Sequence, residues 1–307
     1  MVSECQLSGF AFHSEPSQRL VRTTIQVILG TGPGWSPVDW AGEAWLIFCD
    51  TFLAARLIIA ASRMLPTISG TIDVIAVQST YSRPTPRLGG LAVFVSFLIA
   101  INFIETPLKG QMTIFFGAAT PLLLFGCLED LGRPVKPFWR LMAAAVSSAL
   151  VVLFIGRWIP RLDIPGLDAA MGLFPVAALV TIFTCTATSH AFNIIDGLNG
   201  LCIGLGVVAF GIMATIAYAS SDQTLCEYLV FLAVALVGVL PWNYPRARLF
   251  LGDSGAYMLG FLVSWMAIAI VWRNPQVTPW ALVLVISGLS PRPPIRSGDA
   301  GGRVLRL

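Results

Sequence analysis

Charged side chains are scarce in this chain, which has only 19 lysines and arginines and 16 aspartates and glutamates among 307 residues. Charged residues make up 11% of the sequence and hydrophobic residues 56%, and the mean hydropathy is +0.79. Soluble domains typically carry about 25% charged residues, so this composition excludes an ordinary soluble domain. It predicts an integral membrane protein.

Histidine and cysteine are too sparse for a zinc site or a disulfide framework. The only histidines are His13 and His190, and the six cysteines are scattered singly along the chain. The net charge is only +3 and no basic cluster is present, so nucleic acid is not expected as a partner. The start of the chain also lacks the basic segment, apolar run and cleavage site of a signal peptide.

Long apolar runs predict the membrane spans, because a spanning helix needs about 20 mostly apolar residues. We expect an all-α, polytopic membrane helix bundle of about eight or nine transmembrane helices. A weaker span is expected at 42–62, where Glu43, Asp50 and Arg56 interrupt the apolar pattern, and 279–290 indicates the start of another. The clearer predicted spans are 88–106, 112–128, 140–156, 173–191, 201–219, 226–242 and 254–272.

The loops between these spans differ in positive charge from one face to the other. Threading the spans in order places eight basic residues on one face: Arg63, Arg83, Arg87, Arg133, Lys136, Arg140, Arg246 and Arg248. The other face receives four: Lys109, Arg157, Arg161 and Arg273. Cytoplasmic loops carry an excess of lysine and arginine, so the first face is predicted to be cytoplasmic. Every motif described below lies on that face.

Two of the motifs combine basic residues or acids with helix-breaking residues. In SRPTPRLGGLAV, Arg83 and Arg87 could hold phosphate oxygens, or could anchor a helix end among lipid headgroups. In CLEDLGRPVKPFWRL, Glu129 and Asp130 are neighbouring acids at the mouth of a span. Such a pair suits a magnesium or phosphoryl site, and also suits a solvated helix end.

Two further motifs place single acids beside glycines. In HAFNIIDGLNGL, Asn193, Asp196 and Asn199 would share one side of a helix, although a polar cap that only ends the span is the alternative. In RLFLGDSGAYMLGF, Asp253 stands just before a span, where it could cap the helix or bind Mg²⁺. Carboxylates for a cation and arginines for phosphates are the groups that phosphoryl transfer needs. At a membrane surface, they indicate one lipid reactant and one water-soluble reactant.

The stretches RPTPRLGG, LEDLGRP, NIIDGLNGL and FLGDSGAYMLGF, in that order, resemble the polyprenyl-phosphate N-acetylhexosamine-1-phosphate transferases over residues 78–272. The resemblance implies transfer of a sugar 1-phosphate from a UDP-sugar to undecaprenyl phosphate, with release of UMP. It implies Mg²⁺, with Mn²⁺ as the alternative, and a multi-pass protein of the bacterial inner membrane whose active site faces the cytoplasm. It leaves a homodimer open, and also the choice of UDP-sugar and of polysaccharide pathway.

The resemblance also implies roles for particular residues. Asp253 would bind Mg²⁺, Phe250 would lie against the uracil, and the acid pair would face the lipid phosphate. The implied catalytic residues are Glu129, Asp130, Asp196 and Asp253. The implied substrate-binding residues are Arg83, Arg87, Asn193, Gly197, Leu198, Asn199 and Phe250.

Three departures from the family pattern make a catalytically impaired relative the main alternative. The first acid of the pair is usually aspartate, and a displacement near 1 Å at Glu129 could cost roughly 100-fold in rate. No histidine follows His190, although the family has a histidine-bearing loop near its C-terminus. We expect a transferase domain over 42–290 between atypical segments, 1–41 and 291–307, which suggest truncated or frame-shifted ends. A transporter is a distant alternative, because the acids gather at one face and no clear repeat is present.

Overall fold

The computed structural model describes residues 37–64, 85–103, 108–280 and 283, without the side chains of 37–40 and 63. Arg83, nearly all of the predicted N-terminal segment and the whole C-terminal tail therefore lie outside the described residues. The described elements are α2 (Pro37–Met64), α3 (Gly89–Ala100), η1 (Ile101–Phe103), α4 (Leu108–Asp130), α5 (Pro137–Ile155), α6 (Leu167–Met171), α7 (Phe174–Ile195), α8 (Leu201–Ala219), α9 (Gln223–Asn243) and α10 (Gly252–Arg273).

Seven of these helices are long and apolar enough to cross a membrane, namely α2, α4, α5, α7, α8, α9 and α10. They confirm the predicted polytopic all-α fold. The segment Gly89–Phe103 is a shorter apolar helix, so the span predicted at 88–106 is shorter than expected. Most of the run 279–290 lies outside the described residues.

The weakest predicted span, 42–62, lies within the 28-residue helix α2. Its partly buried acid, Asp50, accepts a hydrogen bond of 2.7 Å from the Ser96 hydroxyl of α3. Arg56 is exposed on the outer side of the helix. The charges that interrupt the apolar pattern are therefore compatible with a membrane-spanning helix, because one is paired and another remains on the surface.

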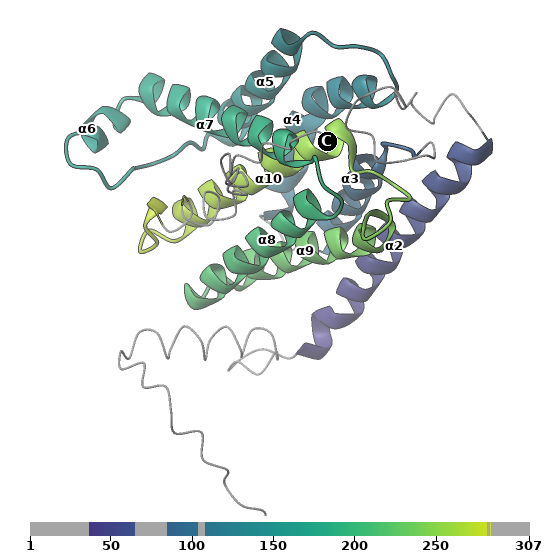
Figure 1. Cartoon of the computed structure of the whole chain (residues 1–307). Coiled ribbons are helices and arrows are strands. Elements are labelled where there is room, and N and C mark those ends of the chain that lie inside the picture. The colour runs from purple at the N-terminus through teal and green to yellow at the C-terminus, as the bar shows by residue number, and fades with distance from the viewer. Residues whose placement is uncertain (1–36, 65–84, 104–107, 281–282, 284–307) are drawn as a thin grey trace, which may run out of the picture.

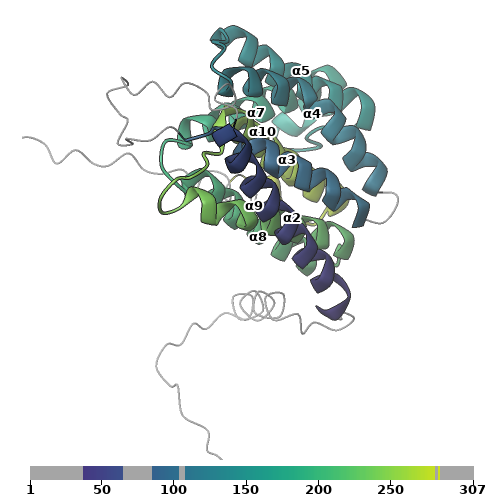
Figure 2. The ribbon, with the colours of Figure 1, turned by 90° about the vertical axis from the view of Figure 1, so that its right-hand side faces the viewer.

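Helix α10 forms the centre of the bundle. It packs against α7 and α4, and also against α3, α8 and α5. In Figures 1 and 2 it lies between a group formed by α4, α5 and α7 and a group formed by α2, α8 and α9. In its most apolar stretch 94% of the residues are buried, compared with 28% in α2. The apolar face of α10 therefore packs against protein, whereas α2 exposes much of its apolar surface to lipid.

Small residues allow the other helices to approach α10 closely. A Cβ atom added at Gly90 of α3 would lie 2.3 Å from the backbone nitrogen of Gly255. One added at Gly126 of α4 would lie 2.4 Å from Cα of Ser254. Close backbone packing of this kind stabilises helix pairs in membranes, where the hydrophobic effect between helices is weak. It fixes α3 and α4 against the first turn of α10.

Candidate active site

The segment that leads into α10 lies against the loop that carries the first motif. The Phe250 amide donates to the Pro86 carbonyl at 2.9 Å, and the Gly89 amide donates to the Phe250 carbonyl at 2.9 Å. The next amide, that of Gly90, donates to the Leu251 carbonyl at 2.7 Å. These paired backbones join RPTPRLGG to FLGDSG, two motifs separated by about 160 residues of chain.

Asp130, at the C-terminal end of α4, caps the N-terminus of α10 from a different helix. Its carboxylate accepts hydrogen bonds from the backbone amides of Asp253, at 2.7 Å, and Ser254, at 3.0 Å. It also accepts one from the Ser254 hydroxyl. Asp130 is 1% exposed, so these three bonds offset part of the cost of burying its carboxyl group. Its predicted contact with a lipid phosphate stays a prediction.

Gly252 makes this close approach possible. Its φ is +81°, a left-handed conformation that L side chains rarely adopt. A Cβ atom there would lie 2.0 Å from the Arg87 carbonyl oxygen and 2.7 Å from both carboxylate oxygens of Asp130. The glycine before the acid is thus needed for the position of both neighbouring segments.

Asp253 lies beside the third motif. Its Oδ1 accepts a hydrogen bond of 2.8 Å from Nδ2 of Asn193, which lies in the last turn of α7. Asp196 follows directly as the residue at which α7 ends, where its backbone amide donates to the Phe192 carbonyl. The end of α7 and the start of α10 therefore bring both motif acids to the same end of the bundle.

Asp196 is subject to an uncompensated negative field. Burial, followed by the charges of Asp253 and Asp130, raises its pKa from 3.8 to about 8, while Arg87 lowers it. Burial is the largest cause of this shift, and the repulsion from Asp253 and from Asp130 outweighs the attraction of Arg87, so the neighbouring charges repel the Asp196 carboxylate on balance. A divalent cation bound there would relieve that repulsion, so the electrostatics suit a cation.

The donor set also decides what kind of cation site could form. Among the described residues, no group of three or more histidine, cysteine, aspartate or glutamate side chains is arranged to hold a metal ion. Mg²⁺ does not require such a cage, since it keeps several waters and commonly takes one or two carboxylates together with substrate phosphates. The Asp253 and Asp196 carboxylates fit that requirement for Mg²⁺ completed by a substrate.

Glu129 and Arg140 form a second polar group beside the acids. Arg140 Nη1 donates to Glu129 Oε1 at 2.7 Å, and both side chains are about one fifth exposed, 22% and 23%. The neighbouring rings of His190 and Tyr257 lie 5.0 Å apart. Within the described part of the chain, Glu129 Oε2, Arg140 Nε and His190 Nε2 are buried without a hydrogen-bond partner. Three helices thus present polar atoms that a water molecule or a substrate oxygen could satisfy.

The remaining predicted residues occupy the rim of this end. Arg87 is exposed, and its charge acts on both Asp196 and Glu129. Gly197 and Leu198 are exposed, Leu198 by 69%, whereas Phe250 is partly buried. The described parts of all four motifs therefore lie at one end of the bundle, while the roles of their side chains stay predictions.

Asn243, at the C-terminal end of α9, was not predicted. Its Oδ1 accepts a hydrogen bond from the Gly200 amide, and its Nδ2 donates to the Leu249 carbonyl at 3.0 Å. It is 3% exposed and so joins the loop after Asp196 to the loop before Asp253 in the interior. The signal in the sequence is a lone asparagine that ends a long apolar run, in the stretch LPWNYP.

The bundle, with acids gathered where α4, α7 and α10 meet, defines a polytopic membrane protein with a candidate metal-assisted phosphate site at one end. A sequence profile described as glycosyl transferase family 4 matches residues 112–271, more than half of the chain. This chain belongs to glycosyl transferase family 4, the family of polyprenyl-phosphate hexosamine-1-phosphate transferases.

Three similar proteins are bacterial and are transferases by name. The chain is 22% identical over 245 residues to a probable undecaprenyl-phosphate N-acetylglucosaminyl 1-phosphate transferase of Bacillus subtilis, covering 79% of this chain and 67% of the relative. It is 24% identical over 259 residues to the undecaprenyl-phosphate alpha-N-acetylglucosaminyl 1-phosphate transferase of Yersinia pestis, with the same coverage. It is 28% identical over 222 residues to a phospho-N-acetylmuramoyl-pentapeptide-transferase of Geobacillus, covering 66% of this chain and 64% of the relative. The chain thus spans about two thirds of the length of each.

Proposed function

We propose that this protein transfers an N-acetylhexosamine 1-phosphate from a UDP-sugar to undecaprenyl phosphate and releases UMP. The reaction would take place at the cytoplasmic face of the bacterial inner membrane, as an early step of cell-envelope polysaccharide synthesis. The observation that carries the proposal is the convergence of Asn193, Asp196 and Asp253 at one end of an apolar bundle. Family membership and the names of the relatives support the same reaction class.

The chemistry is one displacement at phosphorus. An oxygen of the lipid phosphate forms a bond to the phosphorus that carries the sugar, and the bond from that phosphorus to the UMP oxygen breaks. No other group is oxidised, reduced or released, so the products are a lipid-linked sugar pyrophosphate and UMP. Positioning and charge stabilisation are the main contributions that a protein makes to such a transfer.

The nucleotide pyrophosphate would meet side chains more than the amides of the α10 N-terminus. A free helix N-terminus attracts phosphate, but Asp130 already accepts from the amides of Asp253 and Ser254 in the first turn of α10. Arg87 is exposed at the rim and carries the positive charge that acts on Asp196. We assign phosphate binding to Arg87 and assign Mg²⁺ binding to Asp253, where the ion would offset the pyrophosphate charge.

The lipid phosphate would approach from the side of α4 and α5. Glu129 Oε2 and Arg140 Nε both lack partners among the described residues. Arg140 can attract the phosphate and orient one of its oxygens, while Glu129 is held by Arg140 at 2.7 Å. Under this proposal a basic group, and not only the acid pair, would lie beside the attacking oxygen.

The proposal is tested by UMP release from the purified chain in lipid nanodiscs, with Mg²⁺, undecaprenyl phosphate and a panel of UDP-sugars. We expect release with at least one UDP-N-acetylhexosamine. The Asp253→Asn variant should lose about 100-fold in rate, because a charge that binds the cation is removed. Glu43→Gln on α2 is the control with the same chemical change, far from the motif end, and should retain the rate.

Two results would contradict the proposal at different levels. Undiminished release by Asp253→Asn would remove the metal assignment and leave the reaction intact. If the wild-type chain binds a UDP-sugar or undecaprenyl phosphate and releases no UMP with any donor, it is a binding relative that does not turn over. In that case, the metal assignment is tested by comparing the nucleotide affinity of Asp253→Asn with that of the wild-type chain.

A further inference from the structure

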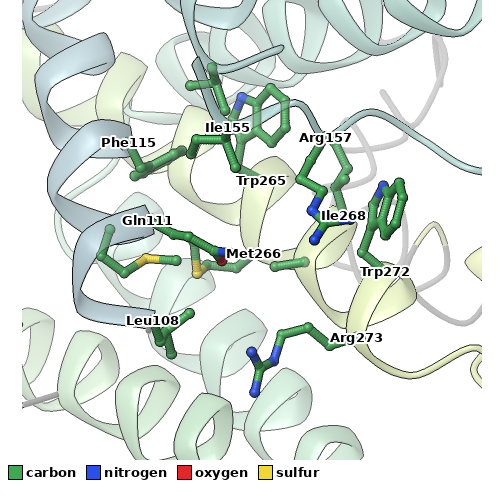
Figure 3. Close-up of a pocket in the computed structure, with 13 residues that line it drawn as sticks. Leu108, Gln111, Phe115, Ile155, Arg157, Trp265, Met266, Ile268, Trp272 and Arg273 are labelled. Carbon is green, nitrogen blue, oxygen red and sulfur yellow. The ribbon is translucent and has the colours of Figure 1, made fainter. Parts of the chain in front are cut away.

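A pocket lies at the end of the bundle opposite the acids. It is formed where the N-terminal part of α4, the C-terminal end of α5 and the C-terminal part of α10 meet (Figure 3). Helix α10 has 22 residues and a rise of about 1.5 Å per residue, so its two ends are roughly 33 Å apart. That distance is close to the thickness of the hydrocarbon core, so the pocket and the acid site lie near opposite membrane surfaces.

The wall of the pocket is apolar and reaches toward the bundle interior. Leu108, Met112 and Phe115 of α4 line one side, and Met266 of α10 lines another. All four are at most 4% exposed. A flexible hydrocarbon chain is the ligand that such a wall accommodates without an unpaired polar group.

Among the described residues that line the pocket, Arg157 carries a positive charge without a paired carboxylate. Arg157 follows Gly156, whose left-handed conformation (φ +67°) ends α5. The Arg157 guanidinium lies 4.0 Å from the centre of the Trp272 ring. In the described portion of the chain, no carboxylate or other hydrogen-bond acceptor is paired with it. Stacking on the ring orients the guanidinium and leaves its N–H groups free to donate.

The neighbouring arginine is different. Arg273 donates two hydrogen bonds to the Asp222 carboxylate, at 2.6 and 2.7 Å, so its charge is compensated. The Gln111 amide lies on the α4 side of the same pocket, opposite Arg157 in Figure 3. Within the described residues, the mouth therefore offers the unpaired Arg157 guanidinium and the Gln111 amide next to an apolar wall.

We propose that this pocket binds an anionic phospholipid of the leaflet opposite the acid site, with its phosphate on Arg157 and one acyl chain against α4 and α10. A zwitterionic headgroup fits less well, because its ammonium group would bring a further positive charge toward Arg157. Free phosphate would satisfy Arg157 and leave the apolar wall unfilled. This proposal is independent of the transfer reaction.

The size of the headgroup preference follows from the single charge. One arginine near a membrane surface contributes about 1 kcal/mol of attraction toward an anionic lipid, which is roughly a fivefold change in affinity. A larger side chain that fills the space beside the apolar wall should instead weaken the binding of every phospholipid. The two effects separate headgroup recognition from chain recognition.

The test is native mass spectrometry of the purified, delipidated chain titrated with phosphatidylglycerol and phosphatidylcholine of identical acyl chains. For the first bound lipid, we expect phosphatidylglycerol to bind about fivefold more tightly. Arg157→Gln should remove this preference, and Arg157→Lys should keep most of it. Arg133→Gln, which removes an exposed charge at the motif end, should leave the preference unchanged. Ala269→Phe, at the pocket wall, should weaken the binding of both lipids.

Several outcomes would overturn the proposal. Equal affinities in the wild-type chain, or an undiminished preference in Arg157→Gln, would exclude recognition by this arginine. Undiminished binding by Ala269→Phe would place the lipid elsewhere. A pocket filled by another segment of this chain or by a second copy would show no saturable first lipid, and the second copy would appear as a dimer. If Arg157→Gln does not fold, two other measurements decide the question. They are the ratio of phosphatidylglycerol to phosphatidylcholine affinity in Arg157→Lys and the affinity of both lipids for Ala269→Phe.

Discussion

Replacing Asp130 with alanine should destabilise the protein by about 4 kcal/mol. The substitution leaves three donors at the α10 N-terminus without an acceptor, the amides of Asp253 and Ser254 and the Ser254 hydroxyl. Each buried donor left unpaired costs about 1 to 3 kcal/mol, and some relief comes from water that enters the space. Asp130→Asn keeps one acceptor oxygen, so we expect about half of that cost. The measurement is equilibrium unfolding of the purified chain by sodium dodecyl sulfate in mixed micelles.

Comparison with the neighbouring acid shows whether this reasoning is correct. Glu129 makes a single partly exposed ion pair with Arg140, so Glu129→Gln should cost less than about 1 kcal/mol. The free energy of unfolding of Asp130→Ala could instead lie within about 0.5 kcal/mol of the wild-type value while UMP release is abolished. That result would show that Asp130 does not stabilise the protein by capping α10. The residue would then act on a substrate, as the family resemblance implies.

Three further substitutions test other parts of the same end. Gly252→Ala should destabilise the protein by about 3 kcal/mol, because the added Cβ would lie 2.0 Å from the Arg87 carbonyl oxygen and φ is +81°. Gly117→Ala is the control and should be neutral or slightly stabilising, because a Cβ there has nothing within 4 Å. Thermal unfolding compares the two variants. Asn243→Ala should cost about 2 kcal/mol in the same assay by removing two interior hydrogen bonds, and an unchanged midpoint would show that the two loops are held otherwise. The folded-state pKa of Asp196, about 8, exceeds the usual 3.8, so without divalent cation the free energy of unfolding should fall as pH rises from about 4 to about 8, by at most about 1.4 kcal/mol per unit. Asp196→Asn should flatten that fall, and a slope identical to wild type would contradict the raised pKa.

The spans and the gathering of motifs could be predicted from the sequence. Apolar runs about 20 residues long leave few alternatives to a helix in lipid, so the predicted spans correspond to α4, α5 and α7 to α10. Threading alternates the loops between faces, and this alone places Asp196 and Asp253 at the same end. Their separation of 57 residues along the chain was no obstacle, because the intervening pair of helices returns to the same face.

The particular partners of the acids could not be predicted in the same way. Asp130 and Glu129 are adjacent in the sequence, yet one caps α10 in the interior and the other pairs with Arg140 near the surface. Which neighbour turns inward depends on how α4 rotates against α10, and that rotation depends on the contact at Gly126. Asn243 is similar, since its two loop partners are determined only once the helices have packed.

The central position of α10 has a consequence for biosynthesis. Its contacts with α3, α4, α5, α7 and α8 are all with helices that are synthesised earlier. Those helices enter the membrane before the segment that separates their inner faces has left the ribosome. Until α10 arrives, the carboxylate of Asp130 has no amides to accept from and the small residues of α3 and α4 have no backbone to contact. Packing of the earlier described helices therefore depends on a later one, and a chain stopped before Gly252 would expose their inner faces.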